Sequence, residues 1–138
     1  MGVASALVFA NLGASYGTAK AGVGIASLSV IDSSKILKSI IPAIMAGILA
    51  LYGVIVSVLL QGQAKDASNQ KDGYKLLGAG LCCGLSSLAS GLAIGVVGDA
   101  GVRAYAQTDG IFVGMILVLI FSEAIGLYGF IVAIIISQ

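Results

Sequence analysis

Long apolar stretches alternate with short polar ones and divide the chain into four segments. About 20 apolar residues are enough to cross the ~30 Å hydrocarbon core of a bilayer, and each segment reaches that length. Hydropathy therefore predicts an all-α membrane protein with four transmembrane helices. The four predicted helices are Met1–Ile31, Ile36–Leu60, Tyr74–Gln107 and Ile111–Ser137.

Three polar stretches connect these helices, at residues 32–35, 61–73 and 107–110. The first reads Asp-Ser-Ser-Lys, and Asp32 and its serines are typical helix-capping residues. Short connections make consecutive helices antiparallel neighbours. Because the number of helices is even, both chain ends are expected on the same side of the membrane.

The second half of the chain repeats the first. Residues 48–53 resemble residues 124–129, and residues 21–23 match residues 100–102. Self-similarity at offsets of 76 and 79 positions (48 to 124 and 21 to 100) indicates an internal duplication, here of a two-helix hairpin. We therefore predict a single membrane domain, 1–138, built from two hairpin repeats, 1–62 and 63–138.

Glycine and other small residues gather in the first and third predicted helices. These two helices hold twelve of the twenty glycines, so the other two are left with bulkier, more lipid-suited side chains. Small residues recur every four positions, with Gly13 and Gly17 in one helix and Gly91 and Gly95 in the other. Such faces let helix backbones approach closely in lipid. Helices 1 and 3 are expected to form a tight inner layer, and helices 2 and 4 an outer one.

Composition narrows the chemistry that the chain can perform. The 138 residues are 59% hydrophobic and only 9% charged, as expected of a membrane protein. A net charge of +1 gives no reason to expect a nucleic-acid partner, and the absence of His excludes a His-ligated metal or an imidazole relay. Cys82 and Cys83 are adjacent on a helix, where side chains point about 100° apart, so no mutual disulfide is expected.

One carboxylate, Glu123, lies near the centre of the last apolar helix. A charged acid at that depth costs about 2.5–3.5 kcal/mol or more, so such residues are rare and usually functional. Desolvation by Phe121 and Ile120 disfavours the charged form of the carboxyl. Glu123 is thus expected to be neutral while it faces lipid and to ionise only with water or a cation beside it, as an ion carrier does.

Three other residues are predicted to support this site. Ser122 precedes the acid, and Tyr128 follows five positions later, although that spacing is not ideal for a hydrogen bond along one helix. Gly47 aligns with Glu123 at the repeat offset of 76 positions (47 to 123), so the first repeat has no acid at the equivalent position. The chain carries no Lys or Arg near mid-membrane, and the counter-charge must come from another protein.

The chain closely resembles the proteolipid c subunits of eukaryotic V-type proton-pumping ATPases over nearly its whole length. An acid followed, four positions on, by Leu-Tyr-Gly is the most specific shared feature. The matching stretches are LGASYGTAKAGVGIA (12–26), KSIIPAIMAGILALYG (38–53), GLAIGVVGDAGVRAYAQ (91–107) and FVGMILVLIFSEAIGLYGFIVA (112–133).

This resemblance implies a ring of c-type subunits that turns in the membrane of a vacuole, lysosome or other acidic endomembrane compartment. Glu123 would take the place of the family's proton-carrying glutamate and would discharge beside an arginine of the stator a subunit. Central-stalk subunits would bind on the cytosolic side, where the 32–35 and 107–110 turns would lie. The chain would have no catalytic residues and no cofactor, and the transported ion would be H⁺. Relative to the family, we expect a shortened N-terminus.

The identity of the ion follows from the neighbours predicted for Glu123 on the second helix. These are Ala46, Gly47, Ala50 and Leu51, none of which has a polar side chain. Because a hard cation prefers several oxygen ligands, we expect a proton rather than sodium.

Two other classes of function remain alternatives. A small multidrug–proton antiporter can also have four helices and one membrane acid, but the duplicated hairpin and glycine-rich inner helices favour a ring. In a passive pore or purely structural oligomer, Glu123 would be dispensable. The number of subunits in the membrane distinguishes the antiporter from the rotor, because an antiporter would be a dimer and a rotor a closed ring.

Overall fold

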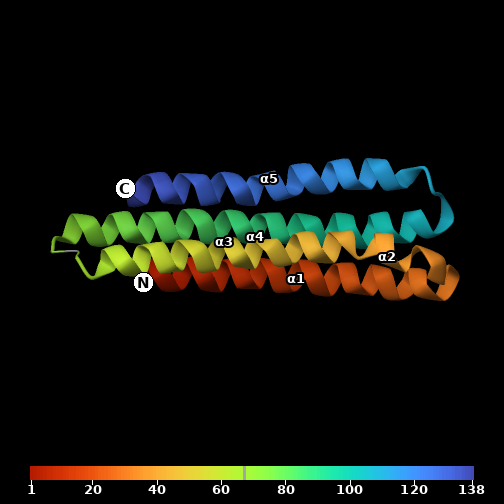
Figure 1. The fold of residues 1–138 in the computed structure, drawn as a ribbon, viewed down its shortest axis with the longest axis horizontal. Coiled ribbons are helices and arrows are strands. Elements are labelled where there is room, and N and C mark those ends of the chain that lie inside the picture. Colours follow the sequence, from red (N-terminus) through yellow and green to blue (C-terminus); the bar gives the residue numbers. More distant parts are fainter. Residues whose placement is uncertain (67) are drawn as a thin grey trace.

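The computed structural model describes residues 1–66 and 68–138, and it is all-helical in that part of the chain. Four long helices run along the axis of an elongated bundle, each antiparallel to the next one in the chain (Figure 1). They are α1 (Gly2–Ile31), α3 (Ile41–Ala64), α4 (Gln70–Gln107) and α5 (Ile111–Ser137). A short segment joins α1 to α3 and consists of η1 (Ser33–Lys35) and α2 (Ile36–Ser39). The predicted helical class is confirmed.

The two chain ends lie at one end of the bundle, together with the connection between α3 and α4 (Figure 1). The η1–α2 segment and the α4–α5 turn lie at the opposite end. The predicted polar connection 61–73 is shorter here, because α3 continues to Ala64 and α4 begins at Gln70. Residue 67 of that connection lies outside the described residues.

The second predicted helix is divided in two by the structure. The prediction was one helix from Ile36, whereas α2 ends at Ser39 and α3 starts at Ile41, with Pro42 in its first turn. Proline has no amide hydrogen and tolerates only the first turn of a helix, which explains the break before it. Asp32 caps η1 as predicted, since its Oδ1 accepts from the Ser34 amide over 3.0 Å.

Helix α1 packs chiefly against α4 and then against α3, while α5 packs chiefly against α4. The buried face of α1 consists of glycine and alanine except for Leu28. Larger side chains fill the core where α3, α4 and α5 meet, including Leu49, Ile94 and Leu119. Helix α1, with its buried face of glycine and alanine, therefore lies against the glycine-rich helix α4.

Three helical segments in the described part of the chain are long and apolar enough to cross a membrane. They are Ser33–Ala64, Gln70–Gln107 and Ile111–Ser137. Helix α1 is not among them, because it carries Asn11 and Lys20 and is built largely of glycine, alanine and serine. Its passage through the membrane, predicted from the sequence, stays a prediction.

Candidate functional site

Glu123 lies midway along α5, with its side chain partly buried between α5 and α3. The hydroxyl of Tyr52, on α3, donates a hydrogen bond to Oε1 of Glu123 over 3.4 Å. This distance is long for a hydroxyl donor, whose usual range is about 2.5–3.0 Å. The contact nevertheless shows which polar group faces the acid.

The ring of Tyr52 is held in place by the aromatic ring of Phe130 and by the hydrophobic core. It lies 5.1 Å, centroid to centroid, from the ring of Phe130 on α5. It also packs against both hydrophobic clusters of the core. Because the ring has little freedom to move, its hydroxyl has a defined position beside the carboxyl.

Ser122 secures the helix that carries the acid and does not contact the carboxyl through its hydroxyl. That hydroxyl donates to the carbonyl of Val118 over 2.9 Å, within α5. The carbonyl of Ser122 accepts from the hydroxyl of Ser90, on α4, over 2.7 Å. The residue next to Glu123 therefore ties α5 to α4.

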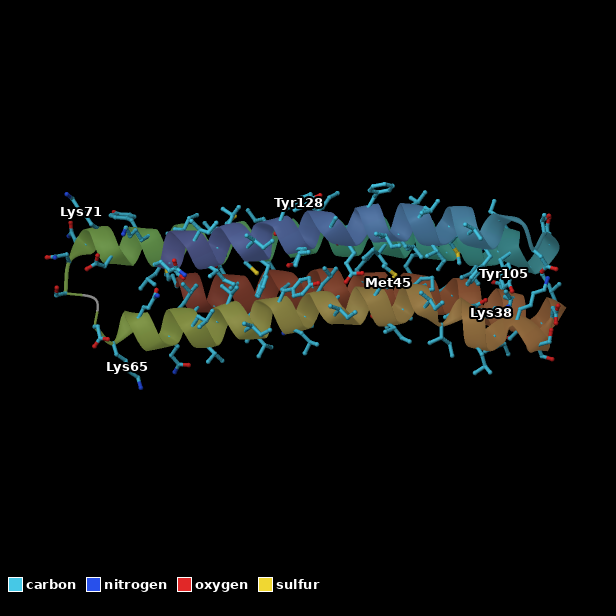
Figure 2. All side chains as sticks on the ribbon, turned by 45° about the horizontal axis from the view of Figure 1, so that its top comes forward. Lys38, Met45, Lys65, Lys71, Tyr105 and Tyr128 are labelled. Carbon is cyan, nitrogen blue, oxygen red and sulfur yellow. The ribbon has the colours of Figure 1, made fainter. Side chains whose placement is uncertain are left out.

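Tyr128 and Gly47, the other two predicted supports, are both exposed in the single chain. The Tyr128 side chain is 63% exposed, and Figure 2 shows it at the outer edge of α5. Gly47 is exposed, with open space where a side chain would project. In the part of the chain that the structure describes, no hydrogen bond joins either residue to Glu123.

The expectation that the second helix offers Glu123 no polar side chain is wrong, because Tyr52 was not among the four neighbours considered. The internal repeat nevertheless indicated that Tyr52 could lie near the acid. Tyr52 is the equivalent of Tyr128 at the offset of 76 positions (52 to 128). A tyrosine already suspected near the acid therefore had a counterpart on the neighbouring hairpin.

The four glycines predicted to pack helices lie together at the interface of α1 and α4. A side chain added at Gly91 would meet the backbone of Gly13, and one added at Gly95 would come within 3.0 Å of the Gly17 Cα. The same applies to Gly17, where an added Cβ would lie 2.8 Å from the Gly91 carbonyl oxygen. These contacts lie within one chain, so a role between subunits stays a prediction.

Three basic side chains near helix ends, those of Lys20, Lys35 and Arg103, pair with carboxylates other than Glu123. Asp99 binds Lys20 at 3.4 Å and Arg103 at 2.7 Å. Lys35 binds Asp109 at 2.7 Å. Within residues 1–66 and 68–138, no ion pair includes Glu123. Over the same residues, no group of three or more His, Cys, Asp or Glu gathers as metal ligands.

Both cysteines are free thiols, as predicted from their adjacent positions on a helix. Cys83 is buried in the core near Val56 and Ala79, and Cys82 is partly buried. They act as small packing residues of α4.

Comparison with known proteins places these features in a family. The family model for the C subunit of ATP synthase matches two segments, residues 1–60 and 77–136. The second segment begins 76 positions after the first (residue 77 against residue 1), the spacing of the internal repeat.

Curated relatives match nearly the whole chain. The human 16 kDa proteolipid c subunit of V-type proton ATPase is 57% identical over 137 residues, which cover 99% of this chain and 88% of the relative. The protein of the same name from Nephrops norvegicus is 57% identical over 97% of this chain and 86% of its own. A Caenorhabditis elegans relative, the 16 kDa proteolipid designated c 2, is 56% identical over 99% and 87%. The chain belongs to the family of ATP synthase C subunits, and within it is similar to the proteolipid c subunits of V-type proton ATPases.

Proposed function

We propose that this chain is a proton-carrying subunit of the rotor ring of a V-type proton ATPase. The observation that carries the proposal is the contact between Glu123 and Tyr52. It joins a carboxyl in the middle of an apolar helix to one neutral donor, with no cation paired to the acid in the described residues. An acid in such surroundings is rare and usually functional.

The carboxyl of Glu123 binds a proton while it faces lipid, because apolar surroundings favour the neutral acid. It releases the proton where water or a cation lowers the cost of the charge. Since the bundle supplies no cation there, an arginine of the stator a subunit is the proposed partner. The Tyr52 hydroxyl holds the carboxyl oxygen in place between these events.

A ring explains how four helices of such different character fit one membrane. Helices α1 and α4 form the inner layer, supported by the glycine contacts that bring their backbones together. Helices α3 and α5 form the outer layer, supported by exposed apolar side chains such as Val58 on α3 and Phe121 on α5. In this arrangement α1 is a fourth span, sheltered from lipid by the ring.

Each chain carries one proton site. The family match in two segments supports a duplicated hairpin, 1–62 and 63–138, and the equivalent of Glu123 in the first repeat is Gly47. Gly47 faces open space in the single chain and offers no ionisable group. A ring of these subunits therefore moves one proton per chain per turn.

The transported ion is H⁺ rather than sodium. A hard cation prefers several oxygen ligands. The carboxyl of Glu123 has one recorded partner in the described residues, the Tyr52 hydroxyl, at a distance suited to a hydrogen bond. Ligands for a metal cation would have to come from elsewhere.

The remaining assignments follow from the ring. The chain is not an enzyme by itself, because ATP hydrolysis takes place in other subunits of the complex. The end with the η1–α2 segment and the α4–α5 turn faces the cytosol and the central stalk. The membrane is that of a vacuole, lysosome or another acidic compartment.

The proposal is tested by ATP-driven acidification of vesicles that contain the assembled complex. Glu123→Gln should abolish pumping while the amount of assembled complex stays near that of the unchanged protein, because glutamine keeps the size of the side chain but cannot release a proton. Asp66→Asn, at an exposed position after α3, is the matched control and should pump normally. Pumping by the Glu123→Gln complex would exclude the carrier role.

A further inference from the structure

A pocket of about 450 Å³ opens at the end of the bundle that carries the two turns. It lies between the η1–α2 segment and the start of α5. The residues that line it include Lys35, Lys38, Tyr105, Asp109 and Phe112. Figure 2 shows Lys38 and Tyr105 near each other at this end, far from Lys65 and Lys71.

The two lysines of the pocket are in different electrostatic states. Lys35 is largely buried and lies 2.7 Å from Asp109 and 3.7 Å from Asp32. Its ammonium also donates to the carbonyl of Tyr105 over 3.3 Å. Its charge is thus balanced by carboxylates already in place.

The charge of Lys38 is not balanced by a carboxylate in the described residues. Lys38 forms no ion pair within residues 1–66 and 68–138, and its ammonium lies 5.9 Å from the centre of the Phe112 ring. The two carboxylates nearest the pocket, those of Asp32 and Asp109, are both bound to Lys35. Of the two lysines in the lining, Lys38 is therefore the one whose ammonium remains without a carboxylate in the described residues.

The setting of the pocket indicates what kind of anion fits. The apolar spans begin at this level, where Val113 lines the pocket and is 66% exposed, and Leu37, next to Lys38 in the chain, is 82% exposed. A ligand with a phosphate at one end and hydrocarbon at the other would satisfy both parts of the surface.

We propose that this pocket binds the phosphate of an anionic membrane phospholipid, with Lys38 as the main cation and the acyl chains lying along Leu37 and Val113. Lys35, fixed by Asp109, shapes the wall of the pocket. The inference rests on the proposed insertion of the bundle in a membrane and not on the proton-carrying role of Glu123. The phospholipid site can therefore be disproved while the proton-carrying role of Glu123 stands, and the reverse also holds.

Lipid selectivity in reconstituted membranes tests the proposal. The full chain is placed in phosphatidylcholine bilayers with spin-labelled phosphatidylserine or phosphatidylcholine, and the fraction of immobilised label is measured. One basic residue near an anionic surface contributes roughly a fivefold preference. Lys38→Gln should lower the selectivity for phosphatidylserine by about that factor, and Lys38→Arg should retain it.

Lys71→Gln, at the opposite end of the bundle, is the matched control and should retain full selectivity. Sodium phosphate should reduce selectivity no more than sodium chloride at equal ionic strength, because free phosphate lacks the acyl chains. Unchanged selectivity in Lys38→Gln would overturn the proposal. So would an equal loss in Lys71→Gln, or specific displacement of the lipid by inorganic phosphate.

Discussion

The Tyr52 hydroxyl reaches Oε1 of Glu123 across 71 positions of sequence, from the second long helix of one hairpin to the second long helix of the other. The contact bridges α3 and α5 at the same depth of the bundle. A hydroxyl that donates to a carboxylate stabilises its charged form. The first repeat, which has glycine at the position equivalent to Glu123, thus contributes a hydrogen-bond donor to the acid of the second.

We predict that Tyr52→Phe increases the rate at which a hydrophobic carbodiimide modifies Glu123. The reagent attacks the neutral acid, and loss of the donor removes one stabilising interaction from the charged form. Because the bond is long, we expect an increase of about two- to fivefold, as for a weak hydrogen bond of roughly 0.5–1 kcal/mol. Mass spectrometry of the modified peptide gives the rate.

Tyr128→Phe is the control for this experiment. Tyr128 is on the same helix as the acid but is exposed and has no recorded bond to it. It should leave the rate unchanged. Equal effects of the two substitutions would show that the Tyr52 contact does not act on the carboxyl, and preferential labelling of Asp66 would contradict the neutral state of Glu123.

Close contact between α1 and α4 predicts that Gly91→Ala destabilises the bundle. The new methyl group would meet the backbone of Gly13, which cannot move aside as a flexible side chain could. Overpacking of this kind costs about 1–3 kcal/mol. Thermal unfolding in detergent, followed by circular dichroism, should show a lower midpoint.

Gly78→Ala provides the comparison on the same helix. A Cβ at Gly78 would meet nothing within 4 Å. Because alanine is the better helix former by about 1 kcal/mol, this variant should unfold at the same or a slightly higher temperature. If both variants behaved alike, helix propensity rather than the α1–α4 contact would determine the result.

The ion pair between Lys35 and Asp109 predicts that Lys35→Gln loosens the α4–α5 turn. The pair joins the η1–α2 segment to that turn at 2.7 Å, but the Asp109 side chain is 79% exposed, so solvent weakens it. Exposed pairs contribute about 0.2–1 kcal/mol. Amide hydrogen exchange at Phe112, whose amide bonds to the Asp109 carbonyl, should accelerate by up to about fivefold. Lys65→Gln should leave it unchanged, and an unaltered rate in Lys35→Gln would mean that the pair does not hold the turn.

The cap at Asp32 predicts a loss of stability in acid. The hydroxyl and amide of Ser34 hold the pKa of the Asp32 carboxyl below its usual value of 3.8. With the pKa lowered in the folded state, the stabilisation is complete above the unfolded value and is lost as the pH falls through the folded one. The midpoint temperature of unfolding should therefore decrease as the pH is lowered below about 4. Asp32→Asn should show a smaller fall over that range, and parallel curves for the two proteins would contradict the role of the charge.

Sequence periodicity anticipated much of this architecture. The polar residues at 32–35 and 107–110 correctly placed two turns, because capping and loss of apolar pattern are local signals. Gly13, Gly17, Gly91 and Gly95 indicated a close helix contact, and the structure brings these residues together. The divided second helix also had a local cause in Pro42, which hydropathy alone does not register.

The partner of Glu123 could not be predicted in the same way. Spacing along α5 pointed to Tyr128, but which face of α3 meets α5 depends on how all four helices pack. That register is determined by contacts such as Leu49 against Gly126 and Ser90 against Ser122. Such contacts join distant parts of the chain and leave no periodic signal. The extensions of α3 past residue 60 and of α4 before residue 74 were missed for another reason. A helix can continue through polar residues outside the hydrocarbon, where hydropathy does not detect it.

The contact of Gly13 with Gly91 has a consequence for synthesis of the protein. Helix α1 is complete when residue 31 leaves the ribosome, yet the surface that covers its glycine face is made some sixty residues later, in α4. Until then the first hairpin has an open side. Its final packing must therefore wait for the second hairpin, and the order of translation becomes part of how the bundle is assembled.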